Sequence, residues 1–99
     1  MTIDELKERL KGVCKDQGVL RLDLFGSRAR SLGQEGNDYD FIAEFADFPP
    51  NEYAKHFFGL LHALEDELHS SIDLMTYRSL KKQSLREKII NERISIYEQ

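Results

Sequence analysis

The spacing of apolar residues predicts that the chain begins with a helix followed directly by a strand. Apolar side chains recur every three or four residues from Ile3 until Gly18, the pattern of an amphipathic helix that ends at the glycine. Thr2, followed three residues later by Glu5, has the spacing of a capping box at the start of such a helix. Residues 19–25 then alternate between apolar and polar side chains, which predicts a strand.

This first strand and a second one, expected over 38–45, each present two different faces. In the first strand the leucines fall on one face, while Arg21 and Asp23 fall on the other. In the second strand the aromatic residues are expected to face the core, opposite the acidic residues. The connection between the strands, residues 26–37, is expected to contain a short helix followed by a loop.

The second half of the chain predicts two more helices and two more strands. Pro49 and Pro50 interrupt the strand pattern, and Asn51 is expected to cap a helix that carries one apolar stripe as far as Ser70. Beyond it, the pattern predicts a strand over 72–77, a helix around Leu85 and Ile89 that Ser79 or Ser84 caps, and a terminal strand over 94–97.

This order of elements predicts one domain over residues 1–99 of the α/β (α+β) class, with a small mixed β-sheet and helices packed on it. The long helix between the second and third strands acts as a crossover, so these two strands are expected to run parallel and side by side. Asp73, near the start of the third strand, would then lie beside Asp38 and Asp40 in the second. Three converging carboxylates could hold two metal ions for phosphoryl or nucleotidyl transfer.

Composition narrows the function classes. The net charge of −4 and the pI of about 5.3 argue against direct binding of nucleic acid. No apolar run approaches the roughly 20 residues of a membrane span, and the N-terminus lacks the layout of a signal peptide, so we expect a cytoplasmic protein. Cys14 is the single cysteine, which excludes an internal disulfide, and its helical spacing predicts a buried thiol.

Candidate chemistry lies on both sides of the connection between the first two strands. Asp38 and Asp40 stand two positions apart in a predicted strand, so their side chains point the same way. Gly26, Ser27 and two arginines follow the end of the preceding strand. Carboxylates supply the hard oxygen ligands that Mg²⁺ prefers, while backbone amides and arginines bind phosphates. The segment therefore predicts a site for a Mg²⁺-bound nucleoside triphosphate.

These residues resemble the DNA polymerase β-type nucleotidyltransferases, whose signature is Gly-Ser, an Arg a few residues later, Asp-x-Asp on the next strand and a third Asp further on. The match covers nearly the whole chain. Since no second substrate-binding domain accompanies it, the chain is most similar to the minimal nucleotidyltransferase (MNT) antitoxins of HEPN toxins. The matching positions are Gly26, Ser27, Arg28, Arg30, Asp38, Asp40 and Asp73.

The resemblance implies a polymerase β-like nucleotidyltransferase fold and an enzyme that uses ATP and two Mg²⁺ ions. It implies transfer of AMP to a tyrosine hydroxyl of a HEPN toxin, with which the chain would form a hetero-oligomer. Asp38 and Asp40 would bridge both metal ions. Asp73 would bind only the ion that activates the attacking hydroxyl, and could accept the proton of that hydroxyl.

The resemblance also assigns the phosphate contacts. Gly26 and Ser27 would place backbone amides and a hydroxyl against the β- and γ-phosphates. Arg30 would reach a triphosphate oxygen, while Arg28 would either do the same or face solvent. Two positions depart from the family pattern, which usually has Gly where this chain has Ser31 and Ser where it has Asn37.

Two other functions are weighed against this one. The chain could be a non-catalytic module that neutralises its partner by covering it, or it could transfer AMP to a small molecule such as an aminoglycoside. Three clustered carboxylates favour the enzyme, because like charges repel one another without a metal. The lack of a second domain argues against a small acceptor. Phe48 and Phe58 are candidates for the contact with a partner.

Overall fold

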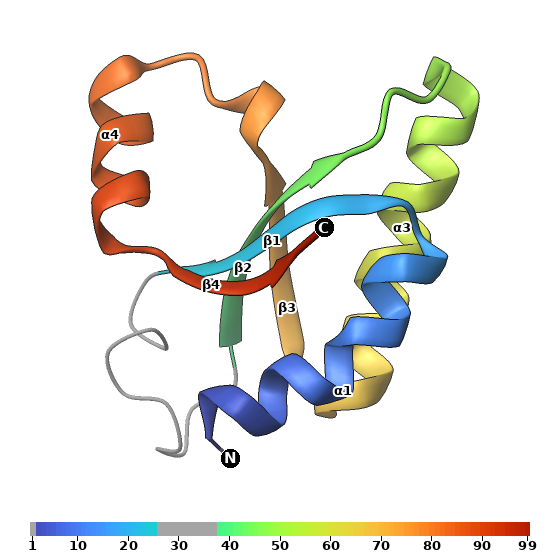
Figure 1. Cartoon of the computed structure of the whole chain (residues 1–99). Coiled ribbons are helices and arrows are strands. Elements are labelled where there is room, and N and C mark those ends of the chain that lie inside the picture. The colour runs from blue at the N-terminus through green and yellow to red at the C-terminus, as the bar shows by residue number, and fades with distance from the viewer. Residues whose placement is uncertain (1, 26–37) are drawn as a thin grey trace.

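The chain forms a mixed β-sheet with helices on both of its faces (Figure 1). The structure, a computed structural model, describes residues 2–25 and 38–99. Its elements are α1 (Ile3–Asp16), β1 (Val19–Phe25), β2 (Asp38–Phe45), α3 (Pro50–Leu68), β3 (Ser71–Thr76), the 3₁₀ turn η1 (Tyr77–Ser79), α4 (Gln83–Glu92) and β4 (Ile94–Glu98).

The described strands pair in the order β3-β2-β1-β4. β1 runs antiparallel to both of its neighbours, β2 and β4, whereas β2 and β3 run parallel. Two parallel neighbours need a long crossover connection, and α3 supplies it. The predicted mixed sheet, and the predicted parallel pairing of the second and third strands, are therefore confirmed.

The main core lies between the sheet and the helices α1 and α3, which share one face of the sheet (Figure 1). Each helix contributes one stripe of buried residues at helical spacing. Cys14 belongs to the α1 stripe, as predicted, and its burial raises the pKa of the thiol to about 12. The stripes are Leu6, Leu10 and Cys14 in α1, and Leu60, Leu64 and Leu68 in α3; they pack on Leu22, Leu24 and Phe41 of the sheet.

A smaller core lies on the opposite face, where α4 packs (Figure 1). Its buried members are Ile42 of β2, Tyr77 and Leu80 after β3, and Ile89 of α4. Ile89 is the one buried residue of α4. Among the described residues, this face of the sheet therefore buries fewer side chains than the face that carries α1 and α3.

The predicted start of the first helix is confirmed, because the backbone N–H of Glu5 donates to the Thr2 hydroxyl at 3.1 Å. The predicted cap of α3 is wrong. α3 begins at Pro50 with Pro49 as its N-cap, so Asn51 lies inside the first turn. Proline is suited to this place, since its fixed φ is helical and the first turn does not use its missing N–H.

The predicted serine caps of α4 are also wrong. Lys82 occupies the N-cap position without a side-chain hydrogen bond, and Ser84 lies within the helix. Ser79 belongs to η1, where its hydroxyl donates to the carbonyl of Thr76 at 2.8 Å.

None of the described helices is long and apolar enough to cross a membrane. The short helix and loop predicted within 26–37 lie outside the described residues.

Candidate active site

Two of the predicted catalytic carboxylates lie side by side in the sheet. Asp40 of β2 and Asp73 of β3 are partners in the parallel register, and neighbouring strands lie about 4.8 Å apart. Two residues further along each strand, Ile42 belongs to the smaller core and Met75 packs against it. Since side chains two apart share a face, Asp40 and Asp73 both lie on the α4 face of the sheet.

The two acids line an open cavity of about 280 Å³ together with Ser71 and Ile72. Asp40 is half-buried and Asp73 is exposed, so a substrate can approach both carboxylates from solvent. Two carboxylates that line such a cavity form a donor set of the kind that Mg²⁺ prefers.

Asp38, the third predicted acid, begins β2 opposite Ser71. Its side chain lies outside the described part of the structure. The predicted convergence is thus confirmed for Asp40 and Asp73, while a metal-binding role for all three acids stays a prediction.

The predicted phosphate-binding residues Gly26, Ser27, Arg28 and Arg30 lie outside the described residues. The strand that precedes them is described as far as Phe25, which is the cross-strand partner of Asp40. The chain therefore leaves β1 directly beside one of the two carboxylates.

A buried polar network lies on the same face of the sheet, one strand further from β3. Asp23 of β1 is completely buried opposite Ile42, and its carboxylate accepts hydrogen bonds from the Tyr77 hydroxyl and, at 2.7 Å, from Nε of Arg21. Nη1 of Arg93 donates to the Tyr77 hydroxyl at 2.9 Å and lies 3.7 Å from the Asp23 carboxylate. Two guanidinium groups thus balance one buried negative charge.

The network changes the acid–base properties of its members. Burial, followed by the hydrogen bond to Asp23, raises the pKa of Tyr77. The hydrogen bond to Asp23 raises the pKa of Arg21, which also pairs with Glu98 of β4. Asp23 was not among the residues that the sequence indicated, because an acidic residue in an alternating strand looks like part of a solvent-facing side.

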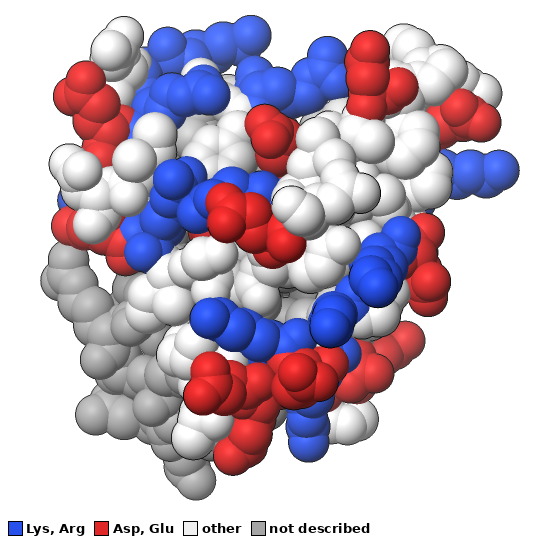
Figure 2. Space-filling view, viewed as in Figure 1, with Lys and Arg blue, Asp and Glu red and all other residues white. Residues whose placement is uncertain are grey.

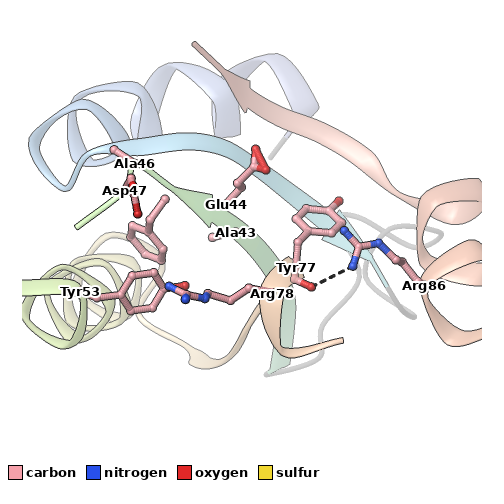
Figure 3. A pocket seen from close by; sticks show the side chains of 9 residues that line it. Ala43, Glu44, Ala46, Asp47, Tyr53, Tyr77, Arg78 and Arg86 are labelled. Carbon is pink, nitrogen blue, oxygen red and sulfur yellow. Dashed lines mark hydrogen bonds between the residues drawn. The ribbon is translucent and has the colours of Figure 1, made fainter. Parts of the chain in front are cut away.

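A second cavity, of about 270 Å³, lies at the other end of β2, next to Ala43 and Asp47 (Figure 3). In it, the Arg78 guanidinium stands 4.7 Å from the centre of the Tyr53 ring, and Nη1 of Arg86 donates to the carbonyl of Tyr77 at 3.3 Å. This cavity shares no lining residue with the one at Asp40 and Asp73. It is therefore separate from the candidate active site.

Comparisons with known proteins agree with this geometry. The family model described as "Nucleotidyltransferase domain" matches residues 6–96. A relative from Methanocaldococcus jannaschii, "Putative protein adenylyltransferase MJ0435", is 30% identical over 96 residues, which cover 97% of this chain and 99% of the relative.

Solved structures share the fold. One, described as "Structure of putative minimal nucleotidyltransferase", is 28% identical with a TM-score of 0.66, and the match covers 95% of each chain. Another, a tri-AMPylated Shewanella oneidensis HEPN toxin in complex with its MNT antitoxin, gives a TM-score of 0.68 at 19% identity, covering 99% of this chain and 74% of the other. With the acid pair on the neighbouring strands β2 and β3 and a family match over nearly its whole length, the chain belongs to the nucleotidyltransferase domain family.

Proposed function

We propose that this chain transfers AMP from ATP to a tyrosine hydroxyl of a HEPN-type partner protein, and that it acts by this reaction as an antitoxin. The observation that carries the proposal is the pairing of Asp40 with Asp73 on the accessible face of the sheet. A protein that only covered its partner would gain nothing from two carboxylates side by side, since they repel each other unless a cation lies between them.

The names of similar proteins support the choice of reaction. The relative from M. jannaschii is named as a protein adenylyltransferase, and the S. oneidensis complex contains an AMPylated HEPN toxin with its MNT antitoxin. By analogy, we propose residues 1–99 as a single minimal nucleotidyltransferase domain. It would act in the cytoplasm in a hetero-oligomer with its partner, without direct contact to nucleic acid or membrane.

Each predicted site residue has a place in this reaction. Asp38, Asp40 and Asp73 would hold two Mg²⁺ ions, which supply charge neutralisation for the triphosphate and activation of the attacking hydroxyl. Gly26, Ser27, Arg28 and Arg30 would bind the triphosphate; their place in the sequence directly after Phe25, the partner of Asp40, supports this role.

The reaction exchanges one bond to phosphorus for another. The tyrosine oxygen forms a bond to the α-phosphorus of ATP, and the bond between that phosphorus and the oxygen bridging to the β-phosphate breaks. Pyrophosphate leaves, and the proton of the hydroxyl passes to the Asp73 carboxylate. Asp73 is suited to accept it, because its side chain is exposed while that of Asp40 is half-buried.

The test offers the product of the adjacent reading frame to the chain as candidate acceptor, with the mass of the intact acceptor and the affinity for nucleotide as readouts. Asp73→Asn is expected to lower the rate of AMP transfer by at least about 10²-fold while nucleotide affinity changes by less than about 10-fold, because the other acids still hold the nucleotide. Arg30→Ala should lower both the rate of AMP transfer and the affinity for nucleotide. Asp66→Asn, an exposed acid on α3, is the matched control and should change neither.

Two results would contradict the proposal. A wild-type transfer rate from Asp73→Asn would remove this carboxylate from the mechanism. If the wild-type chain never adds AMP but still neutralises the toxin in a stable complex, the chain is instead a non-catalytic binding module.

A further inference from the structure

The positive charge of this acidic protein is concentrated around α4. Residues 78–93 hold six of its fourteen basic residues but only two of its eighteen acidic ones, a net charge of +4 where the rest of the chain carries −8. Figure 2 shows Lys and Arg along the top of the molecule, from the region where Figure 1 places α4 toward the centre, with some Asp and Glu beside them. We name the exposed members the basic surface: Arg78, Lys81, Lys82, Arg86 and Lys88.

Within residues 2–25 and 38–99, no acidic side chain pairs with the basic surface. Arg93, the sixth basic residue of the segment, belongs to the network around Asp23, but the five members of the basic surface form no ion pair within the described part of the chain. Surface charges of one sign that lack internal partners attract the opposite charge on another molecule.

Apolar side chains lie exposed within this same surface. Leu85 and Ile90 of α4 are each 41% exposed. A mostly apolar groove of about 270 Å³ lies between α4 and the sheet. It is lined by Leu85, Lys88, Ile89 and Glu92 of α4 and by Phe25 and Met75 of the sheet. A helix of ten residues is marginal on its own, and α4 buries only Ile89. In the part of the chain that the structure describes, the exposed flank of α4 therefore fits burial against a second protein.

The groove borders the acid pair. Phe25, on its sheet side, is the cross-strand partner of Asp40, and Met75 follows Asp73 by two residues on the same face of β3. A molecule held in the groove is thus next to the carboxylates at which AMP would be transferred.

We infer that the basic surface and the groove form the docking site of the acceptor protein, and that the acceptor presents an apolar side chain surrounded by Asp and Glu residues. The inference rests on the proposed function in one respect, namely that the docked molecule is the protein that accepts AMP. A protein is favoured over RNA because the groove is apolar and α4 has no aromatic side chain on which bases could stack.

The first experiment measures binding of a random Glu–Tyr copolymer, which carries carboxylates and tyrosine hydroxyls, to the full chain without ATP. The double variant Lys82→Glu with Lys88→Glu should bind the copolymer at least about 10-fold more weakly, and wild-type binding should weaken as salt is raised. The matched control, Lys7→Glu with Lys11→Glu on exposed positions of α1, makes the same change in net charge and should stay within about 2-fold of wild type.

The second experiment tests the apolar part. Leu85→Gln should weaken copolymer binding, whereas Phe58→Gln should not, although Phe58 is 52% exposed on α3 across the sheet from α4. Equal binding by wild type and the Lys82/Lys88 variant would overturn the inference, as would loss of binding in the Phe58 variant alone. Tighter binding of polyuridylate RNA than of the copolymer would overturn it in favour of nucleic acid.

These results are separable from a failure of the proposed function. Affinity for Mg²⁺ and ATP should be the same in all these variants, because none of the changed residues lines the acid cavity. If the wild-type chain transfers no AMP but copolymer binding is lost only in the α4 variants, the docking surface is supported and the catalytic proposal is contradicted.

Discussion

The hydroxyl of Tyr77 donates a hydrogen bond to the buried carboxylate of Asp23, although 54 residues separate the two in sequence. Arg93 donates to the same hydroxyl, so the phenol lies between a carboxylate and a guanidinium. These contacts join β1 to the turn after β3 and to the residue between α4 and β4. The network thereby fixes the end of α4 relative to the strands that carry Asp40 and Asp73.

Tyr77→Phe is expected to lower the free energy of unfolding by about 1–3 kcal/mol, because the buried carboxylate of Asp23 loses one of its donors while its other oxygen already has no hydrogen-bond partner in the described chain. Tyr53→Phe is the control and should change stability by less than about 0.5 kcal/mol. Urea unfolding measures both. Equal stability of wild type and Tyr77→Phe would show that the bond contributes nothing.

The buried thiol of Cys14 predicts a loss of stability at alkaline pH. Its pKa is raised from 9.0 to about 12 in the folded protein, so the unfolded chain loses the proton first. The stabilising contribution is present below pH 9 and is lost as the pH rises toward 12, with a slope of about 1.4 kcal/mol per pH unit. Cys14→Ala should be less stable at neutral pH but should show a shallower decline as the pH rises above 9. Urea unfolding at a series of pH values measures both proteins. If the free energy of unfolding falls equally with pH in wild type and in Cys14→Ala, the role of the thiol is contradicted.

Mg²⁺ and ATP should bind to this chain together, each strengthening the other. Asp40 and Asp73 repel a bare triphosphate and attract it only through a cation. Calorimetry is expected to show ATP binding in Mg²⁺ that is lost in EDTA, and Asp40→Asn should reduce the difference between the two conditions. Equal ATP affinity in EDTA and in Mg²⁺ would exclude a metal site at these acids.

Two glycines should respond to alanine in opposite directions. Gly18 has a φ of +67°, and a Cβ there would lie 2.5 Å from Cζ of Phe48, so Gly18→Ala is expected to lower the free energy of unfolding by more than about 1 kcal/mol. A Cβ at Gly12, inside α1, would have nothing within 4 Å of it, so Gly12→Ala should raise stability by about 0.5–1 kcal/mol. Thermal unfolding of both variants and of the wild type measures these two changes in stability.

Local patterns predicted the strands better than they predicted the helix starts. Alternation bounded by turn residues predicted β1 and β2 with the bounds that the structure shows. The crossover rule then predicted Asp73 beside Asp40, because a long helix between two strands makes them parallel. The start of α3 was misplaced because asparagine is a residue type that often caps helices. Proline, whose fixed φ is already helical, is equally suited to the first helical position, and Pro50 occupies it.

The buried network could not be predicted in the same way. Asp23 occupies a polar position of an alternating strand, and only the packing of Tyr77 and Arg93 against it makes that position an interior one. The contributions of Gly26, Ser27 and Arg30 remain predictions, since they depend on residues outside the described part of the chain.

The parallel register of Asp40 and Asp73 also determines which changes in chain length the site could tolerate. A strand turns successive side chains to opposite faces, so one residue inserted or deleted between Ser71 and Asp73 would turn Asp73 toward the face that Leu74 now occupies. An extra residue in the turn at 46–49 would leave both strands in register, because α3 lies between that turn and β3. Related sequences should therefore vary in length at that turn and keep a constant spacing across the first half of β3.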